Sequence, residues 1–422
     1  MMIRELKAPI YAQWEVTPKC NYQCIHCYNG WRKHGDVPSD ISIFPKIVDE
    51  IIKNEIFSVT ITGGEPIIVF EELKPYLMKL GNAGITMSLN TNASLITHEI
   101  AKGLKTIGIN NVLVSVPSGS SDVFDQITGS KHALERTMKG IHHLLDNEIM
   151  VSVNMVISLV NIHTIYDTAK IFKDLPIKFF AATRAATPCD YEAFSKYRID
   201  NKQLKYMFDE LLRVKEEFQM KVSSLEFYPY CAFCDEKHFD LFGNRICNAG
   251  KTEIAISYDG TVKPCSHTVV SYGSIEKGIN MAWKRMHDDW RTQKLVPVQC
   301  SECMYRLVCA GGCKQEAYSQ SHSLQAVDPI AMPVCEYRKK KQTITLKECY
   351  FVNVKLRVRE ESNGTVILYV QDSGWRMVRK ELADILVKQR CIDCGILCEH
   401  LHISKNESEH ILTQLVKSGI VI

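Results

Sequence analysis

The cysteines constrain this chain more than any other residue type. Its 422 residues include 17 cysteines, most of them in four groups: 20–27, 231–265, 300–335 and 391–398. A secreted chain would pair them as disulfides, but the first residues, Met-Met-Ile-Arg-Glu-Leu-Lys, lack the apolar stretch of a signal peptide. We therefore expect a cytoplasmic location, where clustered cysteines bind metals more often than they form disulfides.

The overall composition is that of an ordinary globular protein. Hydrophobic residues make up 45 % and charged residues 23 %, and 51 Lys and Arg against 48 Asp and Glu give a net charge of +3. This balance provides no basic surface for nucleic acid, and no apolar run has the length of a membrane span. We expect neither nucleic acid nor a membrane as a partner, and the length favours two or three domains.

The segment 1–225 alternates short apolar runs with longer amphipathic stretches. The stretch 133–147, for example, places Leu134, Met138 and Ile141 on one helical face. Strands joined by helical crossovers predict a parallel α/β sheet, open or curved into a partial barrel, with ligands at the carboxyl ends of the strands. The six expected strands are 10–16, 57–62, 85–90, 112–116, 150–157 and 177–181.

Two further domains are predicted after a helix at 201–218. Residues 226–340 are rich in Cys, Gly and Pro and have few long periodic segments, so we expect them to depend on metal sites more than on an apolar core. Residues 349–422 predict a small α+β domain of winged-helix type. Its expected elements are a hairpin of 350–359 and 365–371, followed by helices at 380–388, 395–402 and 406–418.

The most informative motif follows the first predicted strand. Cys20, Cys24 and Cys27 are separated by three and two residues, which allows three thiolates to hold one iron–sulfur cubane. A [4Fe–4S] cluster usually takes four thiolates, so one iron is left open for another ligand. The alternative is a zinc knuckle completed by His26 or by a distant residue.

A second motif, Gly63-Gly64-Glu65-Pro66, follows the second predicted strand. Glycines there let the backbone approach a ligand closely, and the Glu65 carboxylate could take an ammonium group. Together with the cysteine loop, this motif resembles the radical S-adenosylmethionine (SAM) superfamily. The resemblance implies a (β/α)6 partial barrel, SAM on the open iron, and contacts from the Gly-Gly-Glu-Pro segment to the SAM amine. It also implies a 5′-deoxyadenosyl radical, and a reducing partner such as flavodoxin or ferredoxin.

The same resemblance implies further SAM contacts. Thr91 and Asn92 follow the third strand, where the family often has Thr-Asn-Gly; here the third residue is Ala93. Ser115 stands where the family has a ribose-binding serine, and Arg136 where relatives pair an arginine with the SAM carboxylate. The alternative for each of these is a polar residue satisfied within the protein.

Seven more cysteines form an ordered pattern across 247–335. They read Cys-x12-Gly-x4-Cys, then Cys-x2-Cys-x5-Cys-x3-Cys, then a final Cys. This pattern resembles the SPASM domain, which implies two auxiliary [4Fe–4S] clusters, and hence three in all; a zinc ribbon at Cys300 and Cys303 is the alternative. The first auxiliary cluster would be held by Cys247, Cys265 and Cys313, and the second by Cys300, Cys303, Cys309 and Cys335.

The fourth ligand of the first auxiliary cluster stays open. Leu241 stands where relatives often have a cysteine, so Cys234 is preferred, Cys231 is a second candidate, and an open iron is the alternative. In the tail, Cys391, Cys394 and Cys398 are expected on one helical face as small core residues, with a metal site as the alternative, and Cys349 is expected as an ordinary thiol.

SPASM proteins commonly modify peptides or proteins, so the leading hypothesis is maturation of a ribosomal precursor peptide by crosslinking or oxidation. The tail resembles, weakly, a PqqD-like element that binds a leader peptide. Oxidation of a protein side chain, as in sulfatase maturation, or of a small cofactor precursor is the alternative. The sulfatase-type enzymes have an Asp after the residue that matches Cys265, whereas this chain has Ser266 and then His267, a candidate base. A non-catalytic metal scaffold is the third hypothesis.

Overall fold

The computed structural model describes residues 6–29, 39–187, 194–233, 235–332 and 344–422. These residues form two compact units, one from 8 to 332 and the other from 344 to 422 with residues 6 and 7. No helix in the described ranges is both long and apolar enough to cross a membrane. The predicted domain boundary near residue 225 stays a prediction.

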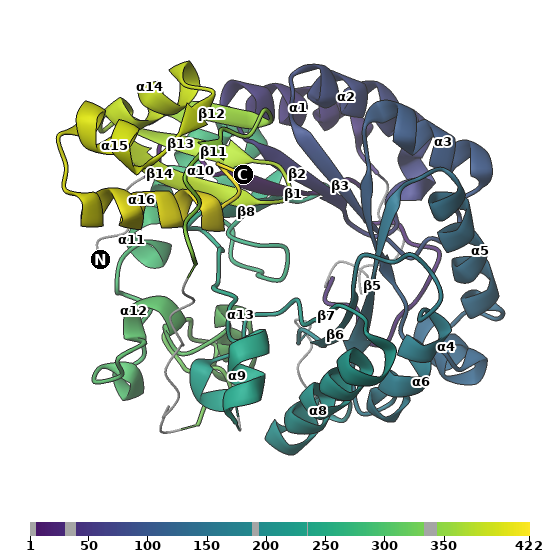
Figure 1. Ribbon diagram of the computed structural model, residues 1–422. Helices are drawn as coiled ribbons and strands as arrows, with labels where there is room; N and C mark the ends of the chain where they lie inside the picture. The colour runs from purple at the N-terminus through teal and green to yellow at the C-terminus, as the bar shows by residue number, and fades with distance from the viewer. Residues whose placement is uncertain (1–5, 30–38, 188–193, 234, 333–343) are drawn as a thin grey trace. The chain divides into compact units, whose positions relative to one another are not determined.

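A ten-stranded sheet organises the first unit, in the order β10-β9-β8-β1-β2-β3-β4-β5-β6-β7. Strands β8 and β1 to β7 pair in parallel, whereas β9 and β10 are antiparallel. The sheet is curved, and the helices between its strands lie on its outer side (Figure 1). The strands are β1 (Tyr11–Glu15), β2 (Ser58–Thr62), β3 (Thr86–Thr91), β4 (Asn111–Ser115), β5 (Met150–Ile157), β6 (Phe180–Arg184), β7 (Val222–Ser223), β8 (Glu253–Ile256), β9 (Thr261–Lys263) and β10 (Gly273–Ser274).

The crossover helices follow the amphipathic pattern of the sequence. The predicted helix at 133–147 is α5, whose buried face includes Ile141 and Leu144, and the predicted helix at 201–218 is α8, which starts with a capping box at Asp200. These helices cover the apolar strands and complete the α/β layers. Their bounds are α1 (Phe44–Lys53), α2 (Phe70–Asn82), α3 (His98–Ile107), α4 (Ser121–Thr128), α5 (Ala133–Asp146), α6 (Ile165–Ile171) and α8 (Asn201–Phe218).

The sixth strand lies later than the sequence predicts. Residues 177–179 of the expected strand 177–181 are half-buried, and the ladder to β5 begins at Phe180. The strand then continues through Ala182 and Thr183 to Arg184, which is only 2 % exposed and is paired with carboxylates. A strand that ends in a buried charge has no apolar pattern to reveal it.

The sheet is also larger than the six strands that the sequence predicts. Strand β8, from the cysteine-rich segment, pairs in parallel with β1 from Tyr11 to Trp14. Its four residues are too few for a periodic signal, yet Ile254 and Ile256 are fully buried. The segment therefore contributes apolar core to the sheet in addition to its cysteines. Its longer helices are α9 (Glu236–Phe242), α10 (Ile279–Arg285) and α13 (Lys314–Ser321), and α12 (Arg306–Cys309) is a single turn.

The second unit has a small three-stranded antiparallel sheet in the order β12-β13-β14. Its core includes Leu368, Leu386 and Leu412. The predicted hairpin and three helices are present, whereas the third strand, β14, and the short pair β11–β15 are not in the prediction. The elements are β11 (Tyr350–Phe351), β12 (Leu356–Glu360), β13 (Thr365–Val370), β14 (Gly374–Arg379), α14 (Lys380–Lys388), β15 (Cys391–Ile392), α15 (Cys394–Leu401) and α16 (Lys405–Lys417).

The prediction of one helical face for the three tail cysteines is wrong. The Asp393 side chain caps α15 by accepting the Ile396 N–H, so the helix begins only at Cys394. Cys391 lies in β15 and forms a disulfide with Cys349, a pairing that is not among the predictions. Cys394 and Cys398 are on α15 and half-buried, as small core residues can be.

Candidate cofactor sites

The loop that carries Cys20, Cys24 and Cys27 is anchored at both ends. Val16 N–H donates to the Thr62 carbonyl where β1 ends, and the N–H groups of Gln23 and Ile25 donate to carbonyls at the end of α4. The three thiols are half-exposed, and the Tyr22 N–H lies 3.4 Å from the Cys20 Sγ. An N–H group aimed at sulfur stabilises a thiolate, as an iron–sulfur ligand requires.

Gly63 and Gly64 pack directly against the start of this loop. The Gly64 N–H donates to the Thr17 carbonyl and the Glu65 N–H to the Lys19 carbonyl, each over 2.7 Å. A Cβ atom on Gly64 would lie 1.9 Å from the Lys19 oxygen. The close approach that requires these glycines is therefore to the protein's own cysteine loop, and their predicted contact with SAM stays a prediction.

The Glu65 carboxylate holds the next loop in place. It accepts the Thr91 hydroxyl over 2.7 Å, the Asn92 N–H over 2.8 Å and the Ile67 N–H over 3.1 Å. Burial raises the pKa of Glu65, and these hydrogen bonds oppose that shift. The Asn92 side chain in turn donates to Asn21 Oδ1, inside the cysteine loop, over 2.9 Å. The three motifs thus form one network at the carboxyl ends of β1, β2 and β3.

The remaining predicted SAM contacts lie around this network. Pro66 is buried and begins a short 3-10 turn after Glu65. Ser115 is the exposed last residue of β4, at the same end of the sheet. Arg136 lies in the first turn of α5, where its guanidinium donates to the Lys131 carbonyl and the Ser130 hydroxyl. Arg136 is thus anchored within the protein, and its pairing with SAM stays a prediction.

His267 connects the first cysteine loop to the cysteine-rich segment. Its ring lies 4.4 Å from the ring of Tyr28, the residue after Cys27, and the Tyr28 hydroxyl hydrogen-bonds with the Ser266 and Thr62 side chains. Desolvation lowers the pKa of His267 to about 4, with a smaller effect from the positive charge of Lys263. The imidazole is therefore neutral at pH 7 and a weaker base than an exposed histidine.

The charge of Cys247 acts on both Cys265 and Cys313, the other two predicted ligands of the same cluster. Burial, and after it the charge of Cys247, raises the pKa of Cys265 to about 12. Burial also raises the pKa of Cys313, followed by the charges of nearby carboxylates and of Cys247. Such thiols resist ionisation unless a bound metal compensates their charge, and this property suits metal ligands.

The other set, Cys300, Cys303 and Cys309, lines one cavity of about 270 Å³ together with Cys231. The Tyr305 N–H donates to Cys303 Sγ and the Tyr230 N–H to Cys309 Sγ, each over 3.4 Å. Several thiols around one cavity, with N–H donors aimed at them, fit an iron–sulfur cluster.

Three cysteines bear on the predicted fourth ligands. Cys335 and Cys234 lie outside the described residues, so their assignments stay predictions. Cys231 is a candidate fourth ligand of the first set, but it lines the cavity of the second, where its Sγ accepts the Met332 N–H over 3.2 Å. The cavity therefore weakens the case for Cys231 in the first cluster.

Residues 14–172 match the family model of the Radical SAM superfamily. The chain thus contains a radical SAM domain, and it is an enzyme. It is 26 % identical over 358 residues to an AdoMet-dependent heme synthase of Nitratidesulfovibrio vulgaris, a match that covers 78 % of this chain and 93 % of that protein. It is also 31 % identical over 178 residues to the subtilosin biosynthesis protein AlbA of Bacillus subtilis, covering 42 % of this chain and 40 % of AlbA.

The fold is similar to that of Streptococcus suis SuiB in its crystal structure with the precursor peptide SuiA. The TM-score is 0.65 at 17 % identity, over 79 % of this chain and 77 % of SuiB. This likeness and the family match confirm the predicted α/β fold with a radical SAM core.

A buried charge network joins the radical SAM sheet to the cysteine-rich segment. Arg184, at the end of β6, pairs with Glu226 and Asp328, and the Cys313 N–H donates to Asp328 Oδ2 over 3.2 Å. Glu316, which is fully buried nearby, accepts from the backbone and hydroxyl of Thr187. This network was not predicted from the sequence, because its members are isolated charges far apart in the chain.

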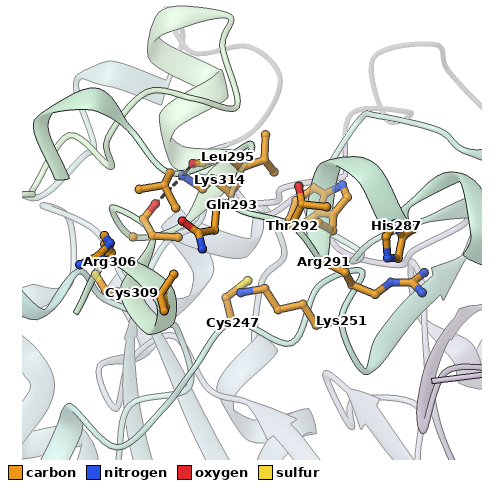
Figure 2. Close-up of a pocket in the computed structure, with 15 residues that line it drawn as sticks. Cys247, Lys251, His287, Arg291, Thr292, Gln293, Leu295, Arg306, Cys309 and Lys314 are labelled. Carbon is orange, nitrogen blue, oxygen red and sulfur yellow. Dashed lines mark hydrogen bonds between the residues drawn. The ribbon is translucent and has the colours of Figure 1, made fainter. Parts of the chain in front are cut away.

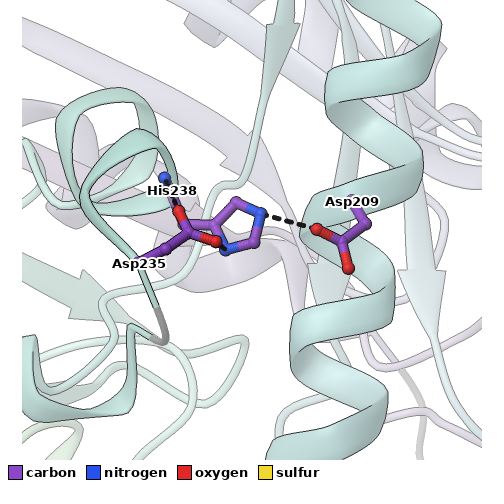
Figure 3. A group of neighbouring side chains, drawn as sticks. All are labelled: Asp209, Asp235 and His238. Carbon is purple, nitrogen blue, oxygen red and sulfur yellow. Dashed lines mark hydrogen bonds and ion pairs between the residues drawn. The ribbon is translucent and has the colours of Figure 1, made fainter.

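Asp209, Asp235 and His238 form another group of possible metal ligands (Figure 3). The fully buried imidazole has Nε2 at 3.0 Å from Asp209 and Nδ1 at 3.0 Å from Asp235. One ion binds only one imidazole nitrogen, and these carboxylates face opposite nitrogens. We therefore interpret the group as polar contacts that hold α9 against α8.

Proposed function

We propose that this radical SAM enzyme modifies a ribosomal precursor peptide, by forming a thioether or carbon–carbon crosslink or by oxidising a side chain. Two of its relatives support a peptide substrate. AlbA is named for the biosynthesis of the bacteriocin subtilosin, and the structure of SuiB holds its precursor peptide SuiA.

In this proposal Cys20, Cys24 and Cys27 hold a [4Fe–4S] cluster, and SAM occupies its open iron. In the same proposal SAM is surrounded by residues 63–66, Thr91, Asn92, Ser115 and Arg136. When bound, the cluster and SAM supply a 5′-deoxyadenosyl radical that abstracts a hydrogen atom from the substrate. The protein's own contribution is to hold the loop rigidly, through the Glu65 carboxylate and the contacts of Gly64 with residues 17–19.

The two downstream cysteine sets hold auxiliary [4Fe–4S] clusters in this proposal, with Cys335 completing the second and Cys234 a candidate for the first. Forming one crosslink removes two hydrogens from the peptide. One leaves as an atom to the radical, and the other leaves as a proton and an electron. The auxiliary sites are suited to receive that electron, and a flavodoxin or ferredoxin is the proposed external electron carrier.

The observation that carries the peptide proposal is the edge of strand β14. In the described part of the chain, β14 pairs with β13 alone, so the backbone groups of its outer edge make no sheet hydrogen bonds. Residues 374–378 are half-buried and residue 379 is exposed, which leaves the edge accessible. An extended leader peptide can add to such an edge as a further strand.

Proline substitutions at neighbouring residues test this edge in the full-length chain. N–H groups alternate between the two edges of an antiparallel strand, so one of Met377 and Val378 donates to β13 and the other faces outward. Proline at the outward residue leaves the β13 ladder intact but removes a donor from the edge. Proline at the inward residue breaks the ladder and lowers the Tm.

The expected result is that the proline variant with the smaller loss of Tm binds a candidate leader peptide at least about tenfold more weakly than the unchanged chain. Fluorescence anisotropy with a labelled leader measures the affinity. Unchanged affinity in both variants would exclude β14 as the docking edge.

A second candidate function is oxidation of a small cofactor precursor, which the similarity to the heme synthase over 78 % of this chain favours.

Oxidation of a protein side chain, with His267 as its base, is a further alternative, weakened by the low pKa of that residue. Reconstituted enzyme should release 5′-deoxyadenosine from SAM under each hypothesis. Only the peptide hypothesis predicts a mass loss of two hydrogens in a short peptide encoded beside this gene.

A further inference from the structure

A cavity lies between the two downstream cysteine sets. It has a volume of about 360 Å³, and its walls include Cys247 of the first set and Cys309 of the second. Lys314 is part of the same wall, although it is only 5 % exposed (Figure 2). A buried lysine that faces both sets needs a reason, because moving an ammonium group out of water is costly.

Backbone carbonyls hold this lysine in one position. The Lys314 Nζ donates to the Leu295 carbonyl over 2.6 Å and to the Ala310 carbonyl at the end of α12, as the dashed lines in Figure 2 mark. Helix α12 ends with Cys309, so the ammonium group is fixed beside a predicted cluster ligand. Two carbonyl oxygens satisfy part of the hydrogen-bonding capacity of the group without neutralising its charge.

Lys314 lies next to thiols of both sets. It directly follows Cys313 of the first set and lines the same cavity as Cys247 and Cys309, and the charge of Cys300 also acts on it. Arg291 is also buried in the cavity wall, but its guanidinium donates to the Gly250 carbonyl and lies over the Trp283 ring. Lys314 is thus placed to act on Cys247 of the first set and on Cys300 and Cys309 of the second.

The charge around Cys313 has the opposite sign. The carboxylates of Glu226, Glu316 and Asp328 all act on this thiol of the first set. A negative environment disfavours adding an electron to an iron–sulfur cluster, whereas a nearby positive charge favours it. The positive charge of Lys314 therefore offsets part of the negative charge around the first cysteine set. It does so where that set faces the second one.

We infer that Lys314 is a shared positive charge that raises the reduction potentials of both auxiliary clusters. The inference rests on the proposed function, which places a cluster at each set. In this role Lys314 contacts no substrate. It acts through the reduction potentials of the two clusters, which determine how readily they accept the electron that the peptide loses.

The test is a redox titration of the reconstituted full-length enzyme followed by electron paramagnetic resonance. In Lys314→Met, both auxiliary clusters should need a lower potential for reduction. The expected change is about tenfold in the ratio of reduced to oxidised cluster at a fixed potential, which is ~59 mV for a one-electron couple. The cluster at Cys20, Cys24 and Cys27 should not shift, and it serves as an internal reference.

Two further substitutions separate charge from structure. Lys314→Arg keeps the charge and should leave the potentials near those of the unchanged enzyme. Lys314→Gln keeps N–H donors for the carbonyls but has no charge, so it should shift both potentials even if the methionine variant fails to assemble its clusters. Lys251→Met is the matched control, because Lys251 lines the same cavity and extends toward Cys247 (Figure 2); it should shift the first auxiliary cluster alone.

Iron content and reduction potential distinguish failure of the proposed function from failure of the role of Lys314. An unchanged enzyme that binds about four irons instead of about twelve would remove the auxiliary clusters, and this inference with them. Twelve irons with unshifted potentials in both Lys314→Met and Lys314→Gln would overturn the inference and leave the proposed function intact.

Discussion

The two kinds of cysteine site in this enzyme are held in different ways. The loop of Cys20, Cys24 and Cys27 is shaped by backbone hydrogen bonds and by close contact with Gly64, and its thiols are half-exposed. The downstream sets sit among charges: carboxylates surround Cys313, and Lys314 faces Cys309 from a buried position.

The first kind of site is therefore defined by the shape of its backbone, and the second by the charged residues around its thiols. The loop of Cys20, Cys24 and Cys27 can keep its shape without a metal, because backbone hydrogen bonds tie it to Thr62, Ile127 and Thr128. The downstream sets contain thiols that resist ionisation, so a bound metal would complete their charge balance. We expect cluster loss to leave the barrel folded and to loosen the cysteine-rich segment.

The largest predicted effect is on the chemistry of the barrel loop. Cys24→Ala should abolish release of 5′-deoxyadenosine from SAM and remove about four irons per chain, with little change in Tm. Iron analysis and chromatography of the reaction measure both effects. Cys398→Ala, in the second unit, is the matched control and should retain full activity. Residual cleavage by Cys24→Ala would break the assignment of the loop.

A large effect on stability is expected from the charged side of the comparison. Arg184→Met would leave Glu226 and Asp328 buried without their cation, which should lower the free energy of unfolding by about 3–5 kcal/mol. Denaturant unfolding measures the change. Lys79→Met, which removes an exposed partner of Asp49, is the control for loss of an ion pair. Equal stability of the two variants would show that the network contributes no special stabilisation.

In the loop held by backbone contacts, Gly64→Ala should lower the free energy of unfolding by about 3 kcal/mol, because the new Cβ would overlap the Lys19 carbonyl. The cysteine loop should move, and the iron content should fall with it. Gly84→Ala serves as the control: unlike Gly64, Gly84 has a positive φ, 73°, but no heavy atom lies within 4 Å of the added Cβ, so only backbone strain of about 1 kcal/mol is expected. Iron retention by Gly64→Ala would mean that the loop tolerates displacement.

A smaller effect is expected from Glu65→Gln. The amide nitrogen of glutamine cannot accept the hydrogen bonds that one carboxylate oxygen now accepts. We therefore expect the free energy of unfolding to fall by about 2 kcal/mol and SAM to bind more weakly. Equilibrium dialysis with SAM measures the affinity. Glu71→Gln, at an exposed residue of α2, should change neither quantity. Tight SAM binding in Glu65→Gln would show that the network is not needed to shape the site.

Much of the fold was predictable because it follows local patterns. The crossover helix at 133–147 and the capped helix at 201–218 have clear periodicity and end signals. Strands β8 and β14 were not predictable: β8 has four residues, and both depend on partners elsewhere in the chain. The cysteine spacings pointed to the sites, since ligand spacing is a local property of the sequence.

The rest of the site could not be predicted, because it depends on contacts distant in sequence. Gly64 and Glu65 are predicted to contact SAM, but nothing in the sequence indicates that Gly64 packs against residues 17–19 or that the carboxylate of Glu65 binds Thr91 and Asn92. The bond between Cys349 and Cys391 spans 42 residues and follows no spacing rule. The position of Lys314 between two cysteine sets likewise appears only when the chain is folded.

The pairing of β8 with β1 has a consequence for synthesis on the ribosome. Strand β1 leaves the ribosome first among the strands, and β2 covers one of its edges soon afterwards. Its other edge waits for residues 253–256, so it stays unpaired while more than two hundred residues are translated. An unpaired strand edge is a template for aggregation, and a nascent chain of this length is a candidate for chaperone binding until β8 arrives.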